Sequence, residues 1–262
     1  MAFFNYKEKN IHYLSEGLGP VIVLLHGYLE NISMWDEIAE KLAKTNQVVR
    51  LDFPGFGKSE CIEHENGMAL YAEITAQLLA LLNIDKYALI GHSMGGYVAL
   101  ELASSYPKKT SQLILFHSTA QADSEEKKAM RNRALKALSK KNAYLKTAIK
   151  LLFPSPFQKT CKRQIDKMIQ EASMLHANGI GVALVGMRER KEHAKTVQDL
   201  TCKTTYIAGK LDPVLDSHQV KIEAQNNKAQ YIELENAGHM SHWESNEKAT
   251  TTLRKTLRIN TL

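Results

Sequence analysis

Gly91-His92-Ser93-Met94-Gly95 decides the fold, together with the runs on its two sides. The apolar run 87–90 before it has the composition of a buried strand, and residues 94–105 show helical spacing. A serine between two glycines at a strand-to-helix junction is typical of a sharp turn that lifts the hydroxyl clear of a sheet. The glycines remove side chains that would collide there, and the helix N-terminus favours negative charge. We therefore predict Ser93 as a nucleophile, against the alternative of a strand–turn–helix that merely contains these residues.

Strands and helices alternate on both sides of this turn. Short apolar runs predict strands at 3–6, 11–16, 21–25, 47–51, 87–90, 112–116, 204–208 and 230–234. Helical spacing between them predicts helices at 34–43, 69–83, 94–105, 215–226 and 244–257. This alternation indicates an α/β fold with a mostly parallel central sheet of about eight strands and helices on both faces.

The alternation stops between residues 121 and 199. This segment predicts helices at 122–141, 143–153, 160–177 and 181–192, with Pro154-Ser155-Pro156 as a break. We therefore expect a core of residues 1–120 and 200–262 and a helical cap inserted at 121–199. The cap carries 17 Lys or Arg against 8 Asp or Glu, a net charge of +9. A solvated helical surface explains this charge, and attraction of anionic substrates is the alternative.

Composition excludes several classes of protein. The 262 residues are 44% hydrophobic and 24% charged, which is ordinary for a globular chain. No run approaches the about 20 apolar residues of a membrane span, and we expect no secretory signal because residues 1–10 are mixed and polar. The three cysteines are far apart and form no zinc motif, so we expect reduced thiols in the cytoplasm. No aromatic interleaving or motif indicates a nucleic-acid partner, and the oligomeric state is left open.

Several motifs that follow one another along the chain resemble, in sequence and in order, those of a known family. They are His26-Gly27-Tyr28, the loop 52–59 of form D-x-x-G-x-G-x-S, the turn at Ser93, Gly209-Lys210-Leu211-Asp212-Pro213, and Gly238-His239. With these the chain resembles the α/β-hydrolase superfamily, and in particular its small, capped, serine esterase-like members. The resemblance covers all of the chain except the cap. It implies a catalytic triad in the chain order Ser93, Asp212, His239.

The base and the acid each have a rival nearby. His239 lies in a polar loop after the last predicted strand, where an imidazole could take and return the serine proton, and Gly238 permits the turn. Its rival, His242, begins the closing helix. Asp212 follows the strand at 204–208 and could orient the imidazole, whereas its rival, Asp216, has the position of a helix cap.

The resemblance also implies an oxyanion hole made by the backbone amides of Met94 and Tyr28, with His26 as a structural brace between loops. Five side chains are candidates to line a substrate pocket, or else simply to pack in the core: Leu29, His117, Ser118, Met187 and Met240. The pair His117-Ser118 follows the carboxyl end of a strand, where ligands bind in such sheets.

These residues predict hydrolysis without a cofactor and without a metal. The first hypothesis is an enzyme that cleaves small to medium carboxylic esters through an acyl-enzyme, so the expected partner is a small-molecule ester. Lactonases, thioesterases and C–C bond hydrolases use the same triad and form the second hypothesis. The third is a ligand-sensing protein on the same fold, with slow or no turnover.

Overall fold

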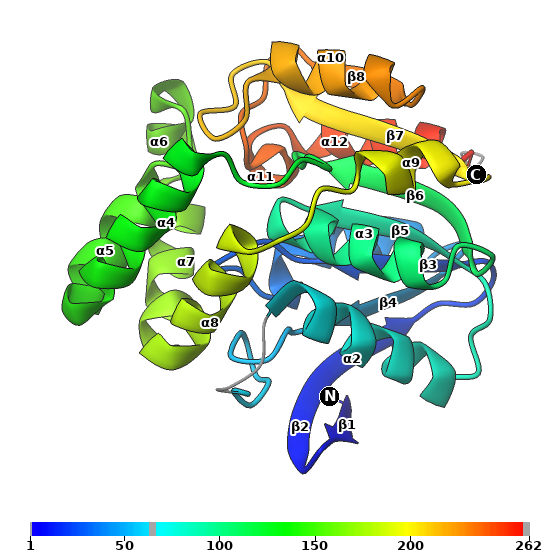
Figure 1. Ribbon diagram of the computed structural model, residues 1–262, viewed down its shortest axis with the longest axis horizontal. Coiled ribbons are helices and arrows are strands. Elements are labelled where there is room, and N and C mark those ends of the chain that lie inside the picture. Colours follow the sequence, from blue (N-terminus) through cyan, green and yellow to red (C-terminus); the bar gives the residue numbers. More distant parts are fainter. Residues whose placement is uncertain (1, 63–66, 259–262) are drawn as a thin grey trace.

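The computed structural model describes residues 2–62 and 67–258, and its centre is one eight-stranded sheet (Figure 1). The strands are β1 (Ala2–Tyr6), β2 (Lys9–Glu16), β3 (Val21–Leu25), β4 (Gln47–Leu51), β5 (Tyr87–His92), β6 (Thr110–Phe116), β7 (Lys203–Gly209) and β8 (Gln230–Leu234). Their order in the sheet is β1-β2-β4-β3-β5-β6-β7-β8. The β1–β2 and β2–β4 pairs are antiparallel and all others are parallel, which confirms the predicted mostly parallel sheet.

Helices cover both faces of the sheet because its central strands are apolar on both sides. In β3, Val23 and Leu25 belong to one buried cluster, and Ile22 and Leu24 belong to another. The first cluster includes apolar residues of α2 (Gly67–Leu81), α3 (Met94–Ser105) and α10 (Ser217–Asn226). The second includes residues of α1 (Asp36–Leu42) and α12 (Asn246–Thr256). Side chains that alternate between two covered faces are the expected result of near-continuous apolar strands.

Six helices and a short 3-10 turn lie between β6 and β7 in the chain. They are α4 (Glu125–Ala137), η2 (Leu138–Lys140), α5 (Lys141–Lys150), α6 (Ser155–Thr160), α7 (Lys162–Met174), α8 (Ala177–Arg188) and α9 (Ala194–Asp199). Figure 1 shows α4–α8 gathered beyond the end of the sheet to which the β7 arrow points. A third buried cluster joins Leu145 of α5 and Met168 of α7 to Leu29 and Met240 of the core loops.

Several helix boundaries in this segment differ from those predicted; α8, for example, spans 177–188 instead of the predicted 181–192. Pro154-Ser155-Pro156, predicted as a break, does separate α5 from α6 and also opens α6, because proline is accepted in the first turn of a helix. Ser124 begins α4 three residues late, since its side chain caps the helix by accepting from the Lys127 amide. The short helix α9 was not predicted. Within residues 2–62 and 67–258, no helix is long and apolar enough to cross a membrane.

Candidate active site

Ser93 occupies the sharp turn between β5 and α3. Its backbone has φ +50° and ψ −116°, a conformation that side-chain-bearing residues rarely adopt. The turn is held by the Ser93 amide, which donates to the Phe116 carbonyl at 3.0 Å. A Cβ on Gly91 would lie 2.3 Å from the Gly95 carbonyl oxygen, and one on Gly95 would lie 2.3 Å from that of Leu25. Glycine is therefore required on both sides of the serine.

His239 lies between Ser93 and Asp212. Its Nδ1 is 2.8 Å from Asp212 Oδ2, and its Nε2 is 3.0 Å from Ser93 Oγ. An ionised carboxylate can only accept, so Nδ1 carries the proton and Nε2 offers its lone pair to the serine hydroxyl. The rival His242 makes no such contact with Ser93. The structure thus brings together the three side chains predicted as a triad.

Asp212 is fixed and ionised. Its Oδ1 accepts from the amides of Val214 at 2.8 Å and Leu215 at 3.0 Å, so the carboxylate cannot rotate away from His239. Burial would raise the pKa of Asp212, but the imidazoles of His239 and His117 outweigh it and hold that pKa well below its usual range. Asp216 instead caps α10, where its side chain accepts from the His218 amide at 2.8 Å.

Met94 and Tyr28 carry the two backbone amides predicted to donate to the oxyanion. Met94 is the first residue of α3, so its amide has no acceptor within the helix. Tyr28 follows Gly27, whose amide donates to Glu30 Oε2 at 2.6 Å and whose carbonyl accepts from the Glu30 amide at 3.4 Å. This tight turn fixes the backbone at Tyr28, and both positions are those predicted for an oxyanion hole.

His26 connects two loops. Its Nδ1 donates to the Gly27 carbonyl at 2.8 Å, and its Nε2 accepts from the Phe53 amide at 3.0 Å. Burial lowers the pKa of His26, which agrees with a neutral ring that has one donor and one acceptor. This is the bracing position that the sequence predicts for it.

The five predicted pocket residues are all buried, and they have different surroundings. Leu29 and Met240 lie in the cluster that joins core loops to α5 and α7, whereas Met187 of α8 packs in the cluster of α2 and α3. Ser118 Oγ donates to the Ser93 carbonyl at 2.8 Å and supports the turn.

His117 contacts the acid of the triad. Its side chain is fully buried, with Nδ1 3.3 Å from Asp212 Oδ2 and Nε2 2.6 Å from Ser241 Oγ. Burial lowers its pKa to about 4, so it is neutral at neutral pH. Leu29 lines a cavity of about 390 Å³.

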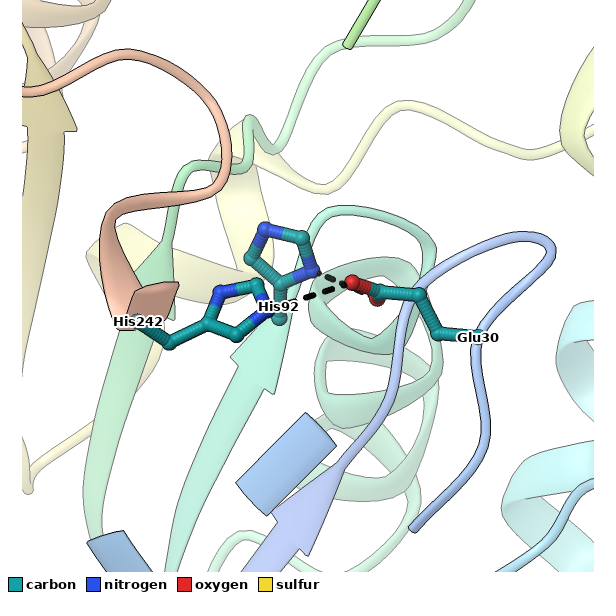
Figure 2. A group of neighbouring side chains, drawn as sticks. All are labelled: Glu30, His92 and His242. Carbon is teal, nitrogen blue, oxygen red and sulfur yellow. Dashed lines mark hydrogen bonds and ion pairs between the residues drawn. The ribbon is translucent and has the colours of Figure 1, made fainter. Parts of the chain in front are cut away.

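Sequence reasoning missed Glu30. Its carboxylate is 2.8 Å from His92 Nδ1 and 3.5 Å from His242 Nε2, and all three side chains are buried (Figure 2). Two groups in the described part of the chain bring three potential metal ligands within 4.8 Å of one another: Glu30, His92, His242, and His117, Asp212, His239. An acidic residue three places after Gly27 was the only signal for Glu30 in the sequence.

Comparison with known proteins gives one family match over most of the chain. A family model described as alpha/beta hydrolase fold matches residues 20–246. A pimeloyl-[acyl-carrier protein] methyl ester esterase of Aliivibrio fischeri is 27% identical over 256 residues, 93% of this chain and 96% of that protein. An uncharacterized protein of Mycobacterium tuberculosis is 36% identical over 99 residues, which are 38% of this chain and only 29% of that longer protein.

Solved structures agree with the architecture. A thermophilic esterase from Thermogutta terrifontis has a TM-score of 0.89 at 28% identity, covering 95% of this chain and 93% of that one. An enol-lactonase from Burkholderia xenovorans also has a TM-score of 0.89, at 22% identity, covering 98% of this chain and 100% of that one. At the lower identity the likeness shows the fold alone.

Proposed function

Because the chain belongs to the alpha/beta hydrolase fold family, we propose that it is a serine hydrolase that cleaves small to medium carboxylic esters. The observation that carries the proposal is the line of contacts from Ser93 Oγ to His239 and on to Asp212, at 3.0 and 2.8 Å. The relatives named as esterases support the ester as the bond that is cleaved.

The first half-reaction forms an acyl-enzyme. Ser93 Oγ attacks the ester carbonyl carbon while His239 Nε2 takes the hydroxyl proton. Asp212 stabilises the resulting imidazolium, and the amides of Met94 and Tyr28 donate to the oxyanion. The tetrahedral intermediate then breaks its bond to the alcohol oxygen, which receives the proton from His239 as the alcohol leaves.

The second half-reaction hydrolyses the acyl-enzyme and regenerates the free enzyme. A water molecule gives a proton to His239 Nε2 as its oxygen attacks the acyl carbon. Collapse of this second intermediate breaks the bond to Ser93 Oγ, which takes the proton back, and the carboxylic acid leaves. One ester and one water therefore give one acid and one alcohol.

In this proposal residues 121–199 form a cap over a core made of residues 1–120 and 200–262. The cluster that contains Leu29 and Met240 together with Leu145 and Met168 supports a cap that closes the site against water. The acyl or alcohol group would lie against Leu29 and Met240, which remain pocket residues of the proposal.

Ester turnover tests the proposal. We expect wild-type protein to hydrolyse p-nitrophenyl acetate or butyrate, and Ser93→Ala to lower kcat by at least about 10³-fold, because the covalent route is lost. Ser105→Ala is the matched control, since Ser105 is exposed at the end of the same helix. Equal release of p-nitrophenolate by wild type and Ser93→Ala would contradict the proposal.

A further inference from the structure

A carboxylate and two imidazoles are sealed in the core next to the site (Figure 2). Glu30 is 3% exposed, His92 1% and His242 0%. None of the three takes part in the mechanism above. An ionised group at this depth is costly unless an opposite charge and hydrogen bonds compensate it.

The hydrogen bonds of His92 fix its charge. Nδ1 lies 2.8 Å from Glu30 Oε2, and Nε2 lies 2.9 Å from the backbone carbonyl of His239. When Glu30 is a carboxylate both partners are acceptors, so both ring nitrogens then carry a proton and His92 is an imidazolium. Its positive charge balances the negative charge of Glu30. Burial acts to lower the pKa of His92, but Glu30 outweighs it, and the net shift is upward.

This ion pair holds three parts of the site at once. Glu30 Oε2 also accepts from the Gly27 amide at 2.6 Å, beside the predicted oxyanion donor Tyr28. His92 immediately precedes Ser93. Its Nε2–H is bonded to the main chain of His239 itself. One carboxylate and one imidazolium therefore connect the nucleophile and the base to the turn at Gly27 and Tyr28, here called the oxyanion loop.

His242 is the second imidazole beside Glu30. Its Nε2 is 3.5 Å from Glu30 Oε1, and burial lowers its pKa well below the usual range, so it is neutral. The other titratable rings that face His92 are His117 and His239, at centroid distances of 5.9 and 5.1 Å. Glu30 Oε2 and both ring nitrogens of His92 have protein partners, whereas Glu30 Oε1 and both ring nitrogens of His242 have no hydrogen-bond partner among the described residues.

We propose that Glu30 and His92 are positioning residues. As a buried carboxylate–imidazolium pair, they hold the oxyanion loop, Ser93 and His239 in the relative positions that the reaction needs. This proposal rests on the proposed serine hydrolase function. Without the carboxylate, His92 loses a proton from Nδ1 or Nε2. The lone pair left on that nitrogen then faces the atom that accepted its hydrogen bond, so that hydrogen bond is lost.

Kinetics test the positioning role. We expect Glu30→Gln and His92→Gln each to lower kcat on a p-nitrophenyl ester about 10- to 100-fold with KM little changed, because small misplacements of reacting groups cost rate. The double variant should be no worse than the poorer single variant, since either change breaks the same pair. Asp85→Asn is the matched control: it removes a carboxylate from an ion pair with Lys109 on the surface, and should leave kcat unchanged.

Nuclear magnetic resonance tests the charge state without any variant. Long-range ¹H–¹⁵N spectra of histidine-labelled wild type should show one ring with both nitrogens still protonated at a pH above the ordinary histidine value of 6.5. Contacts of that ring with Trp35 and Phe116 identify it as His92. A chelator should change neither this spectrum nor the turnover.

The outcomes separate this proposal from the proposed function. A neutral His92 at that pH, or wild-type kcat in folded Glu30→Gln, overturns the positioning role while ester turnover stands. Loss of turnover on chelation overturns it in favour of a metal. If the wild type shows no ester turnover, the proposed hydrolase function is contradicted instead. The positioning role is then tested by the rate at which a fluorophosphonate labels Ser93, which should be lower in Glu30→Gln and His92→Gln than in wild type.

Discussion

Asp212 and Asp216 lie four residues apart in the chain and have different roles. Asp212 Oδ2 faces His239 Nδ1 at 2.8 Å, whereas Asp216 Oδ1 caps α10. Both could be named in the sequence as candidates, because one follows a strand on a loop and the other precedes a helix. Only the spatial contact with His239 assigns them.

Replacement of the two aspartates should give opposite results. Asp212→Asn is expected to lower kcat by about 10⁴-fold, the scale seen when the acid of such a triad becomes neutral. The amide nitrogen would face His239 Nδ1 and favour the tautomer whose Nε2 cannot accept the serine proton. Asp216→Asn should change neither kcat nor stability, since asparagine caps helices as well as aspartate. Comparable kcat losses in both variants would be incompatible with the assignment.

Glu244 should make stability depend on pH. Burial raises its pKa from 4.5 to about 7, although its Oε2 accepts from the Gly238 amide. Between these values the folded chain keeps a proton that the unfolded chain has released, so the free energy of unfolding falls as pH rises through this window. Above pH 7 this contribution changes no further.

Glu244→Gln removes that penalty. The free energy of unfolding of the variant minus that of wild type should be roughly 1–3 kcal/mol larger at pH 8 than at pH 5. Urea denaturation at the two pH values measures the difference. A variant-minus-wild-type difference that is the same at both pH values would show that the Glu244 carboxyl does not titrate in this window.

At the scale of elements, the strands could be predicted and the helices of residues 121–199 only in part. All eight predicted strands are confirmed, because buried strands leave continuous apolar runs in the sequence. The segment 121–199 carries short amphipathic helices among many lysines, and their ends depend on capping residues such as Ser124 and on contacts with the rest of the chain. Periodicity alone therefore did not find α9 or the start of α6.

Two helical glycines should respond in opposite ways to the same substitution. A Cβ at Gly95 in α3 would lie 2.3 Å from the Leu25 carbonyl oxygen, so Gly95→Ala should lower the free energy of unfolding by at least about 2 kcal/mol. At Gly181 in α8 the nearest atom is Leu138 Cδ1 at 3.6 Å. Gly181→Ala should therefore gain about 0.5–1 kcal/mol from helix propensity. Chemical denaturation checks both, and a stable Gly95→Ala would disprove the close contact at the turn.

At the scale of the whole molecule, Arg190 joins the two ends of the segment 121–199 to the core. Its Nη1 donates to Asp123 Oδ1 at 2.5 Å, its Nε donates to the Gln121 carbonyl at 3.0 Å, and its guanidinium lies 4.0 Å from the Tyr97 ring centre in α3. Asp123 is fully buried at its side chain, so this contact neutralises a charge inside the protein.

Arg190→Met should lower the free energy of unfolding by about 2–4 kcal/mol, because Asp123 keeps only its weaker contact with Arg131. Lys195→Met is the control, since Lys195 pairs with Asp199 on the exposed surface and should contribute little. Thermal or urea unfolding measures both. Equal effects of the two substitutions would mean that Arg190 does not hold the segment to the core.

Long-range pairing is the part that the sequence could not reveal. Ser93, Asp212 and His239 could be predicted because each lies in a motif with its own local signal. Glu30 has no such motif, and 62 residues separate it from His92 along the chain. Their pairing depends on β3 and β5 lying side by side, which the sheet order establishes and a single sequence does not.

Covalent labelling tests most directly whether Ser93 is the nucleophile that His239 activates. After brief incubation with a fluorophosphonate, peptide mass mapping should find one adduct, on Ser93, formed far more slowly in His239→Gln. An adduct on another residue of the wild-type chain, or labelling of Ser93 at the same rate without His239, would contradict the account.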